Sequence, residues 1–169
     1  LIIISSLFLI ISSIIDALKS LKVNNRNFSR IISHAAFGFL ILFIGLNHNF
    51  STEKDFNLKL GEVIKSQNFE IKFQNLKLKD EKNYKTIVGE FVIDDLKKET
   101  KQILKPEIRI YENPSTLTYE ASIRSGLLED YYITMSNIDR SDYYNIKFQK
   151  KPFMIWIWIS TLLISLGGF

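Results

Sequence analysis

Residues 31–46 read I-I-S-H-A-A-F-G-F-L-I-L-F-I-G-L, and this stretch decides the fold because it is long and almost entirely apolar. Its one ionisable side chain is His34. With a few flanking residues, such a run reaches the roughly 20 helical residues that span a bilayer core. Similar apolar blocks occupy residues 1–15 and 153–169. The pattern predicts a membrane α-helical protein with three transmembrane segments, at residues 1–15, 31–47 and 153–169.

Two other interpretations of these blocks are weaker. Residues 1–15 lack the basic leader and the small-residue cleavage site of a signal peptide. A buried helix of a soluble protein would explain one such block more easily than three. Because the sequence opens on Leu1 and closes in G-G-F within an apolar block, we expect a fragment of a longer membrane protein in which both end helices are truncated.

The loop between the first two blocks, residues 16–30, orients the helices. Its charged side chains are Asp16, Lys19, Lys22, Arg26 and Arg30. Short loops with an excess of lysine and arginine stay in the cytoplasm. Residues 48–152 are then expected on the extracytoplasmic side of the membrane, although Lys150 and Lys151 argue weakly against this. The remaining charges nearly balance, so no nucleic-acid partner is expected.

Residues 48–152 change from helical blocks to short segments of alternating apolar and polar residues. The expected strands are residues 69–73, 76–79, 87–93, 106–111, 119–123 and 144–148. Turn residues separate them, among them Asp94 and Asp95, Asn113 and Pro114, and residues 79–83. Six or more such strands predict an extracytoplasmic antiparallel β-rich domain, either a sandwich or a small barrel.

No catalytic constellation is visible in this β-rich segment. It has no Ser, His and Asp set, no glycine-rich phosphate loop and no metal-ligand spacing. Its tyrosines are expected to pack within strands. Residues 127–132, L-L-E-D-Y-Y, have the composition of a docking surface and equally that of a rim strand.

The candidate functional residue is His34. A charged imidazolium is costly in hydrocarbon, so His34 should be neutral and either hydrogen-bonded or bound to a metal. A neutral imidazole is a suitable axial ligand for haem iron. The small neighbours Ser33, Ala35, Ala36 and Gly38 would admit a flat macrocycle, or equally a neighbouring helix to which His34 donates a hydrogen bond.

His48, Trp156 and Trp158 lie where the predicted helices meet the outer interface. We expect His48 to be a surface residue. The two tryptophans are expected to anchor the third helix, since aromatic belts occur at both membrane interfaces.

Taken together, several segments resemble the C-terminal part of the CcmF family of cytochrome c-type biogenesis proteins. They are the basic loop followed by S-R-I-I-S-H-A-A-F-G at 29–38, P-E-I-R-I-Y at 106–111, L-E-D-Y-Y at 128–132 and K-P-F-M-I-W-I-W at 151–158. The resemblance runs from about Phe28 to Phe169 and implies a polytopic haem lyase subunit that joins haem to the cysteine thiols of apocytochrome c.

The resemblance also implies a cofactor, haem b, for which His34 supplies one axial ligand. His34 matches the histidine of a family segment similar to G-H-L-G-x-A, with Ser33 in place of the first glycine. The second axial ligand and the tryptophan-rich haem segment would lie before Leu1, so the fragment alone is not expected to be active. The implied partners are apocytochrome c, the haem-chaperone and thiol-handling subunits of the maturation system, and membrane lipids.

A second hypothesis belongs to a different class of protein. The chain could be a non-catalytic, membrane-anchored β domain that scaffolds a complex or binds a protein partner, with His34 serving only in helix packing.

Overall fold

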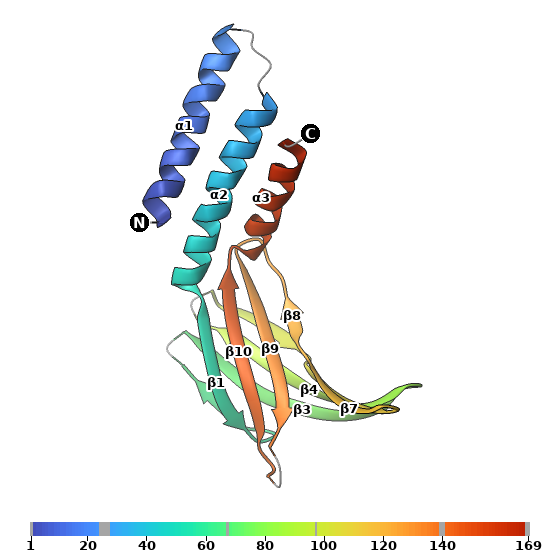
Figure 1. Ribbon diagram of the computed structural model, residues 1–169. Helices are drawn as coiled ribbons and strands as arrows, with labels where there is room; N and C mark the ends of the chain where they lie inside the picture. Colours follow the sequence, from blue (N-terminus) through green and yellow to red (C-terminus); the bar gives the residue numbers. More distant parts are fainter. Residues whose placement is uncertain (1, 24–27, 67, 97, 139–140, 168–169) are drawn as a thin grey trace. The chain divides into compact units, whose positions relative to one another are not determined.

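The computed structural model describes residues 2–23, 28–66, 68–96, 98–138 and 141–167. The chain forms two compact units (Figure 1). The first, which we call the helical unit, comprises Leu1–Ser51, Ser125–Asp130 and Lys151–Phe169. The second, the β unit, comprises Thr52–Arg124 and Tyr131–Lys150.

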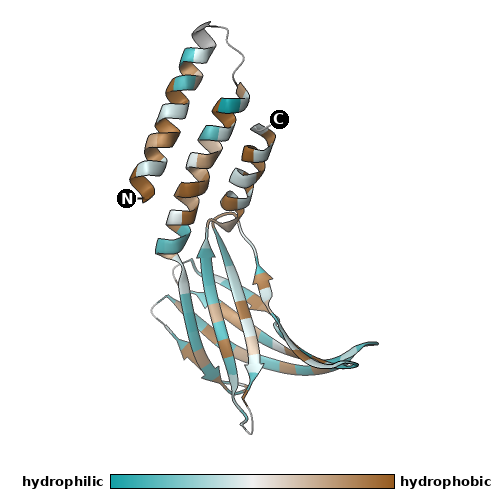
Figure 2. Ribbon diagram, in the orientation of Figure 1, coloured by the Kyte–Doolittle hydropathy of each residue, from teal (hydrophilic) through white to brown (hydrophobic). Residues whose placement is uncertain are grey.

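The helical unit contains three α-helices, α1 (Ile2–Val23), α2 (Phe28–Phe50) and α3 (Met154–Gly167). Helices α1 and α2 extend beyond the apolar blocks, because helix formation does not require the flanking residues to be apolar. Among the described residues, the segments Ile2–Ser20 and Phe28–Phe50 are long and apolar enough to cross a membrane, whereas α3 is shorter. Brown, apolar residues predominate along all three helices (Figure 2).

Small residues let α1 and α2 pack closely and in opposite directions. A Cβ placed on Gly38 would lie 2.8 Å from Cγ1 of Ile10, and one on Gly45 would lie 3.3 Å from Cγ2 of Ile2. Ser6 and Ser13 of α1 are buried, and each donates its hydroxyl to a carbonyl of its own helix, at Ile3 and Leu9. Close contact between small residues is the usual basis of helix association where water is absent.

The β unit is built from strands of two antiparallel sheets. One sheet has the order β1-β10-β9-β8, and the other has the order β2-β3-β4-β6-β7, with β5 paired to β4. The strands are β1 (Thr52–Leu58), β2 (Val63–Lys65), β3 (Phe69–Asp80), β4 (Tyr84–Asp95), β5 (Thr100–Leu104), β6 (Glu107–Glu112), β7 (Ser115–Glu120), β8 (Ser122–Arg124), β9 (Glu129–Asn137) and β10 (Tyr144–Pro152).

These sheets confirm the expected antiparallel β-rich domain and differ from it in detail. The strands expected at 69–73 and 76–79 form one long strand, β3, whose register shifts between Phe73 and Asn75. The strand expected at 119–123 is instead divided at Ala121 between β7 and β8, which belong to different sheets. The expectation that Asp94 and Asp95 form a turn is wrong. Both residues belong to strand β4 and pair with residues of β3 and β5, and Asp95 is buried.

The core lies between the two sheets, which makes the β unit a sandwich. Phe69 of β3 and Phe148 of β10 have ring centroids 4.8 Å apart, and Ile133 and Met135 of β9 are fully buried in the same cluster. Gly89 of β4 allows the close approach, since a Cβ there would lie 2.7 Å from Sδ of Met135. Residues alternate between this apolar core and the solvent, as packed antiparallel sheets require.

The six-stranded sheet continues past the sandwich core as a curled extension (Figure 1). We call residues 76–87 and 108–119 of this sheet the wing. Cross-strand pairing places Leu78, Ile87, Ile108 and Tyr119 in one row on the face that further along forms the core. Leu78 at the end of this row is 80% exposed.

Candidate functional site

His34 lies on α2 beside an open pocket of about 420 Å³. The other lining residues are Leu9 of α1, Ser33 and Phe37 of α2, and Ile164 of α3. The imidazole is exposed, and it makes no hydrogen bond or ion pair with any residue that the structure describes. The interhelical hydrogen bond that would explain a purely structural histidine is therefore not formed with the described parts of α1 and α3.

The small residues around His34 face the neighbouring helices. Gly38 packs against Ile10 of α1, as shown above. Ser33 faces α3, where a Cβ on Gly167 would lie 2.3 Å from the Ser33 Oγ. Ala36 is 2% exposed. These residues thus bring helices together, and they leave the imidazole on an open side of α2.

An apolar stripe continues from His34 along this open side. Phe37, Ile41 and Ile44 follow it at intervals of three or four residues, which places them on one face of a helix. Phe37 and Ile44 are about half exposed. The site is therefore an imidazole that pairs with none of the described residues and lies beside apolar side chains.

This donor set suits haem better than a bare metal ion. No group of three or more His, Cys, Asp or Glu residues that could hold a metal occurs within the described residues. A haem iron needs only one or two axial ligands from protein, because its porphyrin supplies the others. The single imidazole and the apolar pocket lining fit such a group.

His48 and the tryptophans belong to the opposite end of α2 and the start of α3. His48 is exposed, which agrees with the surface position expected for it. The ring of Phe43 on α2 lies 5.7 Å from the ring of Trp156 and 5.8 Å from that of Phe153. The Asn47 side-chain amide donates to the carbonyl of Pro152. These contacts fasten the start of α3 to the end of α2.

Two backbone carbonyls of residues 125–130 accept hydrogen bonds from the start of α3. The Trp156 indole Nε1–H donates to the Leu127 carbonyl at 2.8 Å, and the Phe153 N–H donates to the Leu128 carbonyl at 2.8 Å. Phe153 has a φ of 62°, which is strained for a bulky residue and requires support from its surroundings.

Asp130 organises the same segment from within. Its Oδ1 accepts the N–H of Gly126 at 3.0 Å, and its Oδ2 accepts the Ser125 hydroxyl at 3.4 Å. A Cβ on Gly126 would lie 2.8 Å from the Glu129 carbonyl oxygen, so the turn requires glycine. Asp130 is thus a buried structural residue at the start of β9, which favours the rim-strand interpretation of this segment over the docking surface.

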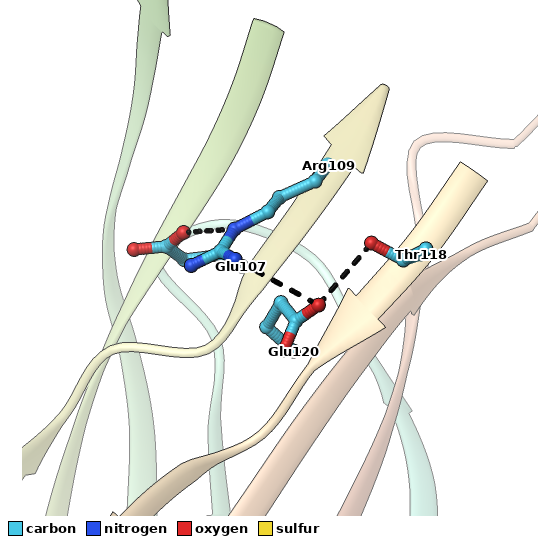
Figure 3. Close-up of polar contacts among 4 residues, drawn as sticks. All are labelled: Glu107, Arg109, Thr118 and Glu120. Atoms are coloured by element: carbon cyan, nitrogen blue, oxygen red, sulfur yellow. Dashed lines mark hydrogen bonds and ion pairs between the residues drawn. The ribbon is translucent and has the colours of Figure 1, made fainter. Parts of the chain in front are cut away.

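The P-E-I-R-I-Y segment forms a polar network on the outer face of the wing (Figure 3). The Arg109 Nε lies 3.0 Å from Glu107 Oε2, and its Nη1 lies 3.8 Å from Glu120 Oε1, which also accepts the Thr118 hydroxyl. The hydrogen bond to Glu107 raises the pKa of Arg109. The Arg109 guanidinium also lies 5.0 Å from the Tyr84 ring centroid. Each charged group of the network has an oppositely charged partner within it, so the network is structural.

A buried charged group in the β unit was missed by sequence reasoning. Asp95 Oδ2 accepts the Tyr131 hydroxyl at 2.7 Å and lies 2.9 Å from Lys150 Nζ. The side chain of Asp95 is 5% exposed. These three residues come from β4, β9 and β10, so neither motif nor spacing in the sequence brings them together.

The fold and the site define a protein that combines apolar helices with an antiparallel β-sandwich, and one of the helices carries a histidine without a partner in the described part of the chain. Residues 49–152 match the family model described as the CcmF C-terminal beta-sandwich, and the chain therefore belongs to the CcmF family of cytochrome c biogenesis and haem lyase proteins. This result confirms the resemblance found in the sequence.

Comparison with individual proteins supports the family assignment. The cytochrome c-type biogenesis protein CcmF of Haemophilus influenzae is 28% identical over 148 residues, which cover 87% of this chain and 22% of that protein. The CcmF protein of Escherichia coli is 27% identical over 82% of this chain and 21% of its own length. The chain thus spans about a fifth of the length of these curated relatives.

A solved structure, that of the cytochrome c haem lyase CcmF, shares the fold. Its TM-score is 0.65 at 18% sequence identity, and the match covers 86% of this chain and 24% of that one.

Proposed function

We propose that this chain contributes one axial ligand of a b-type haem, through His34, to a cytochrome c haem lyase of the CcmF type. The observation that carries the proposal is the exposed imidazole of His34, which has no hydrogen-bond partner among the described residues and lies beside an apolar pocket. Family membership supplies the chemical context.

Each residue around His34 has a role in this proposal. The imidazole of His34 would supply a nitrogen lone pair to the iron. Leu9, Phe37 and Ile164 keep water from the ligated face. The bound haem would supply one-electron redox chemistry, and its second axial ligand would come from a part of the full-length protein outside this chain.

We further propose that α1, α2 and α3 lie in the inner membrane and that residues 48–152 lie in the periplasm. The basic residues within 16–30, around the end of α1 and the start of α2, and the apolar helices support this topology. On that side the β-sandwich would stand near apocytochrome c and the haem-delivery and thiol-handling subunits, in the compartment where haem is attached.

The axial role is tested by replacing the histidine in the full-length protein. His34→Ala should abolish the reduced b-haem absorbance of the purified protein, and added imidazole should restore part of it by occupying the vacated pocket. His48→Ala is the matched control, because it removes an exposed histidine from the same helix, and it should leave the spectrum unchanged. An unaltered spectrum in the His34 variant would reject the assignment.

A second function, partner binding by a non-catalytic β domain, is favoured by one observation. Apolar residues of the wing are exposed on the face that further along the sheet forms the core. They include Leu78, Leu117 and Tyr119. If binding is the main function, Leu78→Ser with Leu117→Ser should abolish co-purification of a maturation subunit. His34→Ala should then alter neither binding nor haem content.

A further inference from the structure

We infer that Leu127 and Leu128 form a lipid-contacting loop that enters the outer membrane interface beside α3. The inference rests on the proposed function in one respect, namely that α3 lies in the membrane. It concerns a surface whose residues all belong to the helical unit.

The two leucines are unusually exposed for large apolar residues. Leu127 is 71% exposed and Leu128 is 59% exposed. These fractions match those of the outward residues of α3, Trp158 at 66% and Leu162 at 63%. The loop and the exposed side of the helix therefore offer apolar surface to the same degree.

Hydrogen bonds fix the loop at the level of the interfacial tryptophan. The carbonyl of Leu127 accepts the indole N–H of Trp156, two residues after the first residue of α3. Tryptophan prefers the boundary between headgroups and acyl chains, because its ring is apolar and its N–H needs a partner. Here Leu127 provides that partner, which holds the loop at the same depth as the ring.

Three backbone polar groups of the loop have hydrogen-bond partners within the protein. The carbonyls of Leu127 and Leu128 are both paired to the start of α3, and the N–H of Gly126 is paired to Asp130. A segment that faces water does not need such pairing, whereas a segment that enters an apolar phase does. Paired carbonyls under exposed leucines therefore favour lipid as the occupant.

Depth measurements on the full-length protein test this inference. Single cysteines at positions 127 and 128 would be spin-labelled in nanodiscs of phosphatidylcholine and phosphatidylglycerol, and collisions with oxygen and with a water-soluble nickel chelate would be compared. A label at Leu162 gives the lipid reference, and a label at Lys82, in the exposed turn between β3 and β4, gives the aqueous reference. The labels at 127 and 128 should favour oxygen, as the label at 162 does.

Three other results would count against it. Accessibility mainly to the nickel chelate at 127 and 128 would place the loop in water. Protection from both reagents would show that another protein surface covers it. If Leu162 also reports water, the proposed membrane position of α3 fails as well, so the two failures can be told apart.

Trp156→Phe tests the hydrogen bond separately. This variant keeps an aromatic ring and removes only the donor. The label at 127 should lose part of its preference for oxygen, and the label at 162 should keep its own. An unchanged depth at 127 would show that the indole hydrogen bond does not position the loop.

Discussion

The Tyr131 hydroxyl donates to Asp95 Oδ2 over 2.7 Å and so joins the two sheets of the sandwich through a buried carboxylate. Lys150 Nζ lies 2.9 Å from the same oxygen. Asp95→Asn would remove the carboxylate charge that Lys150 faces and should destabilise the β unit by about 2 kcal/mol, the usual range for a hydrogen bond to a charged group. Hydrogen exchange of β4 and β9 in the full-length protein measures the change.

The matched variant for this network is Tyr131→Phe. It removes one hydroxyl and leaves the pair of Asp95 and Lys150 intact. Its effect on exchange should be smaller than that of Asp95→Asn. Equal effects would show that the charge on Asp95 contributes little.

Gly89 should tolerate no side chain, because a Cβ there would lie 2.7 Å from both Met135 Sδ and Phe91 Cε2. Gly89→Ala is expected to cost about 1–3 kcal/mol through overpacking. A second change, Met135→Val, should recover part of the loss by vacating space. Thermal unfolding of the purified full-length protein would measure both effects, with Thr116→Ala on exposed β7 as a control that should change nothing.

Ser33→Ala should leave haem content unchanged and should not destabilise the helices. The Ser33 hydroxyl is buried without a hydrogen-bond partner among the described residues, so its removal relieves a desolvated polar group. The haem spectrum and the unfolding temperature would be compared with those of the unaltered protein. A large loss of haem would mean that Ser33 has a direct part in ligand binding.

From neutral pH upward, the ion pair between Lys147 of β10 and Glu53 of β1 should persist until strongly alkaline conditions. The hydrogen bond from Lys147 to Glu53 raises the pKa of Lys147 above its ordinary value of 10.5. A raised pKa in the folded state means that the stabilisation is fully present below 10.5 and is lost as the pH rises through the folded value. Circular dichroism should show an alkaline transition that Lys147→Gln weakens. An alkaline transition that this substitution leaves unchanged would contradict the assignment.

The sequence predicts the helices and the long strands well, because their periodicity is strong. It misses β1, T-E-K-D-F-N-L, in which only Phe56 and Leu58 are apolar, and also β2, V-I-K, and β5, T-K-Q-I-L, which are too short to show a period. It also misses β9, although Tyr131, Ile133 and Met135 alternate there, because the acidic residues at its start resemble a loop.

The candidate site is predictable only in part, for a physical reason. His34 is found from residue type alone, since an ionisable group in an apolar helix is unusual. The exposure of His34 depends on how Gly38 and Ser33 pack against α1 and α3. This tertiary packing cannot be read from the sequence. The exposure of Leu127 likewise depends on the hydrogen bond from Trp156, 29 residues away in sequence.

The most direct test of the central claim is an experimental structure of the full-length protein with its haem bound. The proposal predicts a porphyrin against the face of α2 that includes Phe37, with a nitrogen of His34 coordinated to the iron. A haem ligated by other residues, with the His34 ring turned to lipid or bonded to a neighbouring helix, would contradict it.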